Sequence, residues 1–268
     1  MNIALWNTTP GTFWANGIGA AGANLSIIRA DPARCDQALR AGEVDIALVS
    51  TLTAMRDPEA YDIFPEVALS TWHYPFARLV MRNDLNAAAE SLAFDPRYTT
   101  EVLLARLILK EHYGMIPQFR PVDAEEASWV LDIDADAALV VGDDVPYMRP
   151  ESYAMDLGQE WYELANYPMV WGLFAARKGE ASAEMMLALR EAANAAEQTR
   201  EAAATDVSPE LHHFIADDIR VRFDDLAVAS LTEYRQYLFY ENVLTDVPDL
   251  DPVVFPELDE TEAEEDDA

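Results

Sequence analysis

The sequence predicts an α/β fold, and three observations support this prediction. Short apolar runs alternate with helical patterns over roughly the first 180 residues, an alternation that favours mostly parallel strands. A chain of 268 residues is long enough for one large domain or for two modest lobes, each with its own core. Because 51% of the residues are apolar, disorder is excluded as the main state.

The first third of the chain contains the local signals of two strand–helix units. We expect strands at residues 3–6, 25–28 and 44–49. After the second strand, Asp31 is expected to cap a helix that has Pro32 at its first position and ends at Gly42. Ser50 ends the third strand and is expected to cap a further helix that begins near Thr51.

The remainder of the chain continues this alternation and then becomes helical. A loop rich in proline and aromatic residues is expected before the next strands, which we place at 77–81, 92–94, 137–141 and 169–175. Helices are expected at 99–113, from Ser182 onward, and at 209–215 and 223–240. The last segment, 257–268, contains eight acidic residues and no basic residue, so we expect a disordered acidic tail.

The charge balance excludes several kinds of partner. The chain has 49 Asp and Glu against 18 Lys and Arg, which gives a formal net charge of −31. Nucleic acids and anionic membranes are therefore poor partners, because binding to either depends on clustered basic residues. Only two of the bases are lysines, Lys110 and Lys178. This halophile-like balance resembles proteins of salt-accumulating cells, in which salt screens the repulsion between carboxylates.

Cysteine and histidine are scarce, which limits the chemistry that the sequence predicts. The single cysteine, Cys35, cannot form an internal disulfide, and with four histidines we expect no metal site and no metal cofactor. No apolar run approaches the roughly 20 residues of a membrane span. The N-terminal segment lacks the pattern of a signal peptide, so we expect a cytoplasmic protein.

Gly17, Gly19 and Gly22 form a G-x-G-x-x-G pattern. In a dinucleotide-binding unit this pattern opens a helix, whereas here only two residues separate Gly22 from the next predicted strand. We therefore expect a flexible loop and no nucleotide site.

Two histidine positions deserve separate interpretations. His212 and His213 are adjacent in a predicted helix and face different ways, so we expect surface histidines that cannot readily bind one ion together. His73 lies in the loop before residue 77 and is the better candidate for a ligand-facing histidine. A loop histidine satisfied by hydrogen bonds is the simpler interpretation of His73.

Polar residues recur where predicted strands end or helices begin. They form three pairs: Asn7 with Thr8, Ser50 with Thr51, and Thr99 with Thr100. In open α/β sheets, ligands bind at these edges, where helix N-termini present free N–H groups that suit a carboxylate. Each pair alone is explained by helix capping. Three pairs on successive elements favour a binding site.

Several motifs occur together in a fixed order. The N-terminal motif is Asn7 to Pro10, and a spaced pattern follows at Leu39, Gly42, Asp45 and Ser50. After Thr99–Thr100 come Gly142–Asp143, Asp156–Leu157–Gly158, Trp161, and an apolar aromatic run from Pro168 to Phe174. Over roughly residues 3 to 178 this order resembles the chorismate dehydratase family of the futalosine route to menaquinone. The chain departs from it at Ala77–Arg78, where the family has Ser-Val, and at Asn166–Tyr167, where it has Thr-Gly.

The resemblance implies a type II periplasmic-binding-protein-like fold with a ligand cleft between two lobes. Lobe one would combine residues 1–75 with 170–245, and lobe two would be residues 76–169. The implied reaction needs no cofactor: chorismate, a small dicarboxylate, loses water to give 3-[(1-carboxyvinyl)oxy]benzoate. A non-catalytic protein that binds a small carboxylate and the related 1,4-dihydroxy-6-naphthoate synthase are the alternatives.

The resemblance also implies roles for the polar pairs. Asn7 would be the catalytic residue, because its amide could orient the substrate's own enolpyruvyl carboxylate as the internal base. The hydroxyls and helix N-termini would bind the dianion, and Arg78 would add positive charge. The substrate-binding set is then Thr8, Ser50, Thr51, Thr99, Thr100 and Arg78.

Overall fold

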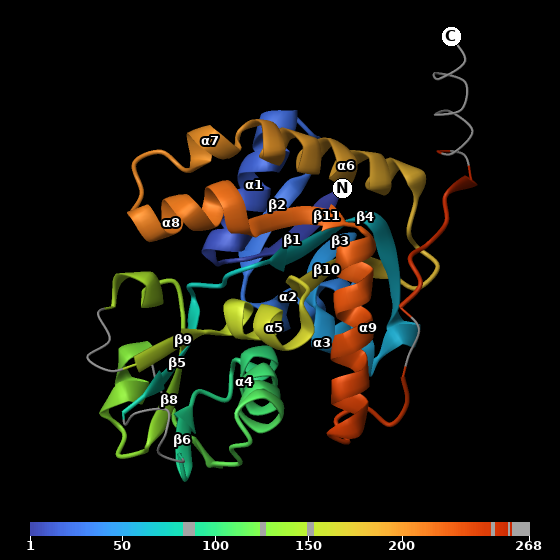
Figure 1. Ribbon diagram of the computed structural model, residues 1–268. Helices are drawn as coiled ribbons and strands as arrows, with labels where there is room; N and C mark the ends of the chain where they lie inside the picture. The colour runs from blue at the N-terminus through green and yellow to red at the C-terminus, as the bar shows by residue number, and fades with distance from the viewer. Residues whose placement is uncertain (83–88, 124–126, 149–152, 248–249, 257, 259–268) are drawn as a thin grey trace.

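The computed structural model describes residues 1–82, 89–123, 127–148, 153–247, 250–256 and 258, which form two β-sheets with helices packed around them (Figure 1). The predicted acidic tail, 257–268, lies outside the described residues except for Leu258. The first sheet has the strand order β11-β4-β10-β3-β1-β2. Its strands are β1 (Asn2–Trp6), β2 (Ser26–Ala30), β3 (Ile46–Ser50), β4 (Tyr61–Thr71), β10 (Met169–Arg177) and β11 (Ile219–Phe223).

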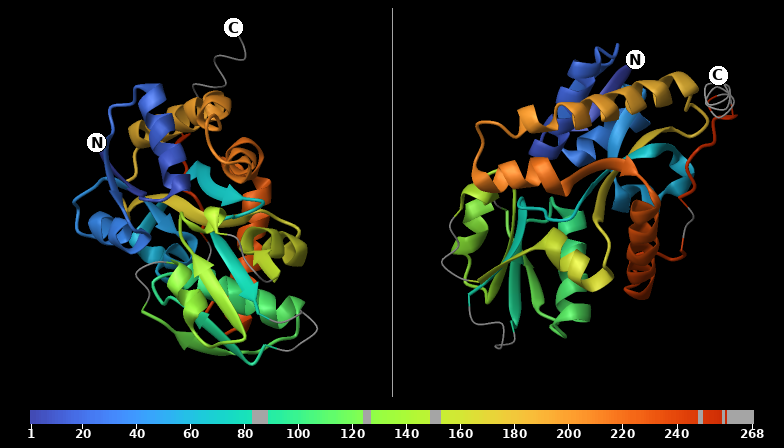
Figure 2. Two further views of the ribbon diagram at one scale, coloured as in Figure 1. Left: turned by 90° about the vertical axis from the view of Figure 1, so that its left-hand side faces the viewer. Right: turned by 45° about the horizontal axis from the view of Figure 1, so that its top comes forward.

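The second sheet is built from the middle of the chain and has the order β7-β6-β8-β5-β9. Its strands are β5 (Ala77–Met81), β6 (Ser91–Phe94), β7 (Gln118–Pro121), β8 (Ala137–Val141) and β9 (Tyr153–Asp156). The chain crosses to this sheet after β4 and returns before β10. Figure 2 shows the two sheets as separate layers joined by these crossings.

Helices flank both sheets. The longest are α1 (Thr9–Ala21), α6 (Ala183–Gln198) and α9 (Asp225–Tyr240). The shorter ones are α2 (Pro32–Arg40), α3 (Thr51–Arg56), α4 (Thr99–Leu107), α5 (Leu157–Ala165), α7 (Arg200–Ala203) and α8 (Pro209–His213). Five-residue π turns extend α4 over Ile108–His112 and α8 over Phe214–Asp218. Single 3₁₀ turns lie at Pro58–Ala60 and Val145–Tyr147, and a six-residue 3₁₀ helix lies at Ala127–Asp132.

The α/β prediction is confirmed, but the prediction of mostly parallel strands is wrong. Among the described residues, four strand pairings are parallel and five are antiparallel. Strand β10 causes much of this difference, because the chain returns from the second sheet and inserts β10 antiparallel between β3 and β4. Such a long-range insertion leaves no periodic signal in the sequence.

The prediction of a loop before residue 77 is also wrong in part, because strand β4 occupies Tyr61–Thr71. Pro65 and Glu66 interrupt its apolar pattern. Glu66 has a positive φ of 64°, and the pairing of β4 with β10 shifts register between Ile63 and Ala68. A β-bulge here accommodates a proline that an uninterrupted central strand would exclude.

Helix α1 replaces the flexible loop predicted for the three glycines. Gly17 lies where α1 packs on α6, and a Cβ there would be 2.5 Å from the Ala192 carbonyl oxygen and 2.7 Å from Ala196 Cβ. Gly22 ends the helix with a φ of 65°. The pattern therefore allows helix packing and helix termination, and it does not open a helix as a nucleotide-binding loop must.

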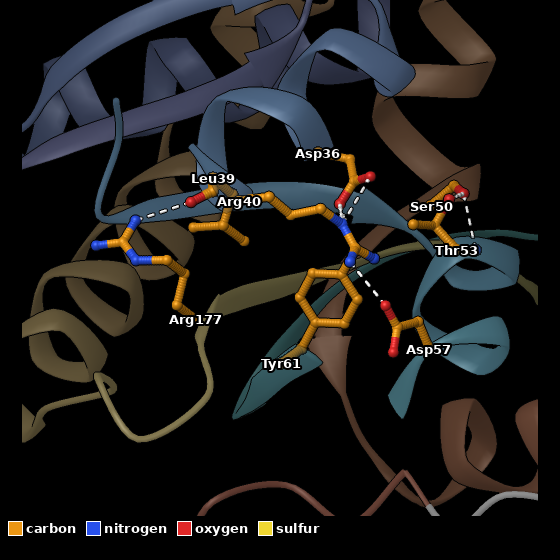
Figure 3. Close-up of polar contacts among 8 residues, drawn as sticks. All are labelled: Asp36, Leu39, Arg40, Ser50, Thr53, Asp57, Tyr61 and Arg177. Atoms are coloured by element: carbon orange, nitrogen blue, oxygen red, sulfur yellow. Dashed lines mark hydrogen bonds and ion pairs between the residues drawn. The ribbon is translucent and has the colours of Figure 1, made fainter. Parts of the chain in front are cut away.

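The predicted caps are confirmed. The Arg34 N–H donates to Asp31 Oδ1 at 2.8 Å, and the Thr53 N–H donates to Ser50 Oγ at 3.2 Å (Figure 3). The spaced pattern from Leu39 to Ser50 has a structural explanation here. Arg177 of β10 donates from Nη1 to the carbonyl oxygens of Leu39 and Val44, each at 2.8 Å, and so holds the turn between α2 and β3 against the sheet.

The two glycines inside α1 predict opposite mutational effects. Gly17→Ala should lower the free energy of unfolding by about 1–3 kcal/mol, because the added methyl group collides with α6. Gly19→Ala is the matched control, since a Cβ there meets no atom within 4 Å. It should raise stability by up to about 1 kcal/mol through helix propensity. Urea unfolding curves of the two variants check this, and equal effects would contradict the packing of α1 on α6.

Candidate functional site

Two of the three predicted polar pairs meet at one edge of the first sheet. Strands β1 and β3 are parallel neighbours, so Asn7–Thr8 and Ser50–Thr51 follow strand ends on the same side. The indole Nε1–H of Trp6 donates to the Leu48 carbonyl at 2.7 Å and fixes the two strand ends together. The side chain of Asn7 is exposed at this edge.

The third pair lies at the corresponding edge of the second sheet. Strands β6 and β8 are parallel, so Thr99–Thr100 and the Gly142–Asp143 motif both follow their carboxyl ends. The Thr9 N–H at the start of α1 donates to Asp143 Oδ1 at 3.1 Å. This hydrogen bond joins the edges of the two sheets and brings Asn7–Thr8 close to the motif after β8.

The start of α1 presents polar groups that the helix does not use. Thr8 is the N-cap residue but makes no side-chain capping bond, and its Oγ1 is buried without a hydrogen-bond partner among the described residues. Arg29 of β2 donates from Nη2 to the Thr8 carbonyl at 3.0 Å and to Thr12 Oγ1 at 2.9 Å. Desolvation lowers the pKa of Arg29, and the nearby Asp143 carboxylate opposes this shift.

Arg78 is less available to bind a substrate carboxylate than we expected from the sequence, because it is already paired with a carboxylate of the protein. Its guanidinium forms an ion pair with Glu210 of α8 and donates to the Val145 carbonyl at 3.4 Å. The cation that lies beside the start of α1 is instead Arg29. Its position on a short, half-exposed strand gives no sequence signal for this role.

Ser50 and Thr51 differ in their availability to a ligand. Ser50 is partly exposed and forms a hydrogen bond with Thr53 Oγ1 at 2.7 Å (Figure 3). Thr51 is completely buried, and its hydroxyl donates to the Val170 carbonyl at 2.8 Å. Thr51 therefore ties α3 to β10, and the structure favours a structural role for it.

Helix α4 begins with a carboxyl group that the sequence interpretation missed. Thr99 is exposed and Thr100 is buried, and Glu101 follows them in the first turn. Burial raises the pKa of Glu101 to about 7. An acidic residue in a first helical turn is usually explained by its favourable interaction with the helix dipole, so nothing in the sequence singled out Glu101.

The surroundings of Glu101 come from both sheets. Burial raises the pKa values of Tyr74, Tyr98 and Tyr234, and the Glu101 carboxylate raises each of them further. Tyr234 lies on α9, and its hydroxyl is buried without a hydrogen-bond partner among the described residues. Glu101 is thus an acid whose pKa lies near 7, and it lies close enough to Tyr234 of α9 to affect the pKa of that tyrosine.

The two chain crossings between the sheets pack against each other. Asp156 accepts hydrogen bonds from the Tyr74 N–H at 2.8 and 2.9 Å, and the Tyr74 ring stacks on Trp171 at 4.0 Å between centroids. A Cβ on Gly158 would lie 2.8 Å from the His73 carbonyl carbon. The Asp156–Leu157–Gly158 motif therefore fixes how the crossings pass each other. Ala77 follows at the start of β5 and is completely buried. The chorismate dehydratase family has serine at this position.

The histidines occupy two different environments. His212 Nδ1 lies 2.9 Å from the Ala204 carbonyl oxygen, whereas His213 faces Asp217 and Asp218, so the prediction that the pair diverges is confirmed. His73 lies 2.8 Å from Asp218 Oδ1. The structure thus brings together His73, His213 and Asp218, three potential metal ligands that their sequence spacing did not reveal.

The architecture defines the class of protein. Over the described residues, no helix is both long and apolar enough to span a membrane. Two mixed sheets joined by paired crossings form the two-lobed α/β fold of periplasmic binding proteins, as the sequence predicted. Within that class, residues 1–240 match the model of a family described as menaquinone biosynthesis. The chain belongs to this family and has a role in menaquinone biosynthesis, which confirms the resemblance at the family level.

Solved structures support the fold. Protein AF1704 from Archaeoglobus fulgidus is 18% identical, with a TM-score of 0.68 over 91% of this chain and 98% of that one. The periplasmic aliphatic sulphonate-binding protein SsuA from Escherichia coli is 14% identical, with a TM-score of 0.66 over 93% and 95%. An ABC transporter protein from Parabacteroides distasonis is 12% identical, with a TM-score of 0.67 over 95% and 99%.

The raised pKa of Glu101 predicts how stability depends on pH. The native state holds this proton more tightly than the unfolded state, so stability falls as pH rises from about 4.5 to about 7 and is not lowered further above that. The loss is at most about 3 kcal/mol. Glu101→Gln should remove this dependence. The melting temperature of the variant minus that of the parent should grow between pH 5 and pH 8, and a constant difference would show that Glu101 titrates normally.

Proposed function

We propose that the protein is a chorismate dehydratase, a lyase that removes water from chorismate without a cofactor. The observation that carries this proposal is the position of Thr99, Thr100 and Glu101 in the first turn of α4, after the parallel strands β6 and β8, where desolvation raises the pKa of Glu101 to about 7. The opposite sheet edge presents Asn7 and the unpaired Thr8 hydroxyl. An acid that can give up a proton at pH 7 thus lies in the same region as donors suited to a carboxylate.

The dianionic substrate has to be held by local donors, because the chain as a whole carries a net charge of −31. The proposed binding groups are the hydroxyls of Thr8, Ser50 and Thr99, the first turn of α4, and the guanidinium of Arg29. Binding would occur between the proposed lobes, residues 1–75 with 170–245 and residues 76–169. The sulphonate-binding protein SsuA, which has this fold, binds a small anionic molecule, and this supports a small-molecule ligand here.

The proposed reaction uses one base and one acid. The enolpyruvyl carboxylate of the substrate, oriented by the Asn7 amide, takes the proton from ring C3. The C3–H electron pair becomes the new ring double bond as the C4–O bond breaks. Glu101 protonates the departing hydroxyl, so that water and the aromatic product form. Aromatisation supplies the driving force, and the protein supplies orientation and proton transfer.

A bound dianion strengthens the acid role of Glu101. Nearby negative charge disfavours the ionised carboxylate, so substrate binding should raise the pKa of Glu101 further above 7. The acid then stays protonated in the complex at neutral pH. The same argument disfavours Glu101 as the base, because an ionised Glu101 would repel the substrate.

Two other functions remain as alternatives, each favoured by one observation. Binding proteins share the fold, which favours capture of a small carboxylate without turnover. The family description covers menaquinone biosynthesis in general and so also includes 1,4-dihydroxy-6-naphthoate synthase, and Ala77 departs from the serine of the chorismate dehydratase family.

The direct test is to incubate the purified chain with chorismate at high salt and to follow the aromatic product by absorbance and mass spectrometry. Formation of 3-[(1-carboxyvinyl)oxy]benzoate with an excess of chelator present would support the proposal. A higher melting temperature with chorismate but no product would support capture. No stabilisation and no product would leave the naphthoate synthase as the better proposal.

Asn7 is the first residue to change. Asn7→Ala should fold normally because the side chain is exposed, and it should lower kcat by roughly 10²-fold because it orients groups in the transition state. Asn7→Asp should be equally impaired, since it places a negative charge beside a dianion. Steady-state kinetics at saturating chorismate provide the measurement, and parental rates in either folded variant would reduce Asn7 to a turn residue.

The pH dependence of turnover distinguishes the acid role of Glu101 from a base role. With Glu101 as the acid, kcat/KM should decline as pH rises above about 7, because the free enzyme loses the required proton. Glu101→Gln should lower kcat by roughly 10²-fold or more. Thr99→Ser is the matched control: it retains the hydroxyl group at position 99 and keeps Glu101, so its kcat/KM should still decline above about pH 7. A rate that instead rises through pH 7 would identify Glu101 as the base.

A further inference from the structure

Three chain segments meet beside the first crossing between the sheets. His73 follows β4, Asp218 precedes β11, and His213 ends α8. Strands β4 and β11 are antiparallel neighbours in which Thr71 pairs with Ile219. The Trp72 N–H donates to the Asp218 carbonyl at 3.3 Å, which extends the pairing by one step. Main-chain pairing therefore places His73 beside Asp218.

A π turn brings His213 to the same place. The segment Phe214–Asp218 continues α8 with hydrogen bonds between residues five apart, so His213 and Asp218 lie near each other on the turn. Arg200 holds this turn from outside, since its Nη1 donates to the carbonyl oxygens of Ile215 at 2.7 Å and Ile219 at 2.9 Å. Single π turns are rare in proteins and occur frequently at functional sites.

The side chains of these residues converge. His73 Nδ1 lies 2.8 Å from Asp218 Oδ1, and His213 Nε2 lies 3.6 Å from Asp218 Oδ2. One ligand atom from each of the three residues lies within 4.8 Å of the others. The Asp218 side chain is only 5% exposed, whereas those of His73 and His213 are 43% and 60% exposed. A buried carboxylate thus faces two histidines that solutes can reach.

A second carboxylate orients His213. Its Nδ1 lies 2.8 Å from Asp217 Oδ2, so in the tautomer with the proton on Nδ1 the Nε2 lone pair is directed toward Asp218 and is available to a metal ion. This arrangement, in which an outer carboxylate holds a histidine in its ligating form, is typical of metal sites. The adjacent His212 faces the Ala204 carbonyl and takes no part.

We propose that His73, His213 and Asp218 bind a divalent transition-metal ion of the zinc class, with Asp217 as the orienting residue. Two imidazoles and one carboxylate are ligands that Zn²⁺ accepts, with water completing the coordination. In a tetrahedral zinc site the ligand atoms lie about 3.3 Å apart, close to the 3.6 Å between His213 Nε2 and Asp218 Oδ2. The 2.8 Å between His73 Nδ1 and Asp218 Oδ1 is a hydrogen-bond distance, so His73 would rotate and lose this proton when it binds the ion.

The position of the site indicates what a bound ion would do. His73 precedes Tyr74, whose N–H is held by Asp156 of the second crossing. Glu210, on the same helix as His213, forms the ion pair with Arg78 of the second sheet. An ion would therefore fasten the α8 segment to the crossing and stabilise the observed arrangement of the sheets. It would lie outside the proposed reaction.

Calorimetric titration with ZnCl₂ tests this proposal. The intact chain is first treated with chelator and dialysed, and an excess of MgCl₂ is kept present to occupy surface carboxylates, which Zn²⁺ would otherwise bind weakly. We expect one ion per chain. His213→Ala and His73→Ala should each weaken binding by about 100-fold or more, and Asp217→Asn by about 10–100-fold.

His212→Ala is the matched control, since this neighbour points away from the cluster, and it should bind Zn²⁺ like the parent. Zn²⁺ should raise the melting temperature of the parent and of His212→Ala, but not that of His213→Ala. His213 is exposed, so its variant should fold, which far-UV circular dichroism checks. No saturable binding by the folded parent, or equal binding by the parent and His213→Ala, would overturn the proposal.

Discussion

The approach of α1 to the end of β1 is the constraint on which the candidate site depends. Gly11 lies in the first turn of α1, and a Cβ there would be only 2.0 Å from the Trp6 carbonyl oxygen. Only glycine permits this closeness. Because the turn lies so near the strand, the Thr9 N–H reaches Asp143 of the second sheet and Arg29 reaches the Thr8 carbonyl. A larger residue at position 11 would displace all of these groups together.

The local electrostatics of the site differ from those of the whole chain. A net charge of −31 repels a dianion at long range, but salt screens that field beyond about 10 Å. Inside the proposed site, Arg29 lies at the start of α1, where it donates to the Thr8 carbonyl and to Thr12 Oγ1. Burial favours the protonated form of Glu101, so this residue adds less negative charge than an ordinary glutamate. The same burial that costs stability above pH 7 thus supplies an acid at neutral pH.

Sequence reasoning succeeded where the cause is local. Asp31 and Ser50 cap their helices as predicted, because a cap depends on residues within one turn. The polar pairs were placed correctly at sheet edges since strand ends carry a local signal. Predictions from the sequence failed where the structure depends on residues far away in the chain. The requirement for glycine at position 17 comes from its contact with α6, and Pro65 is accommodated within β4 by a bulge in the pairing with β10.

The same distinction applies to individual site residues. The three potential metal ligands come from elements far apart in the chain, so no spacing rule could bring His73 to His213. Glu101 stood next to a predicted pair, but its raised pKa is caused by desolvation, which depends on how the folded chain packs around it. Thr51 matched the predicted pattern, yet its contact with Val170 made its hydroxyl unavailable. Motifs indicated the proposed site, and long-range packing determines which of its side chains are accessible.

If Glu101 is a protonated acid beside a bound dianion, its carboxyl group should titrate near pH 7 and at a higher pH once the dianion is bound. Carbon-13 NMR of the labelled Glu side chains, with Glu101→Gln used for assignment, would follow the carboxyl resonance against pH with and without chorismate under conditions of slow turnover. We expect a pKa of about 7 in the free protein and a higher value in the complex. An ordinary glutamate pKa in the free protein, or a pKa that falls on binding, would contradict it.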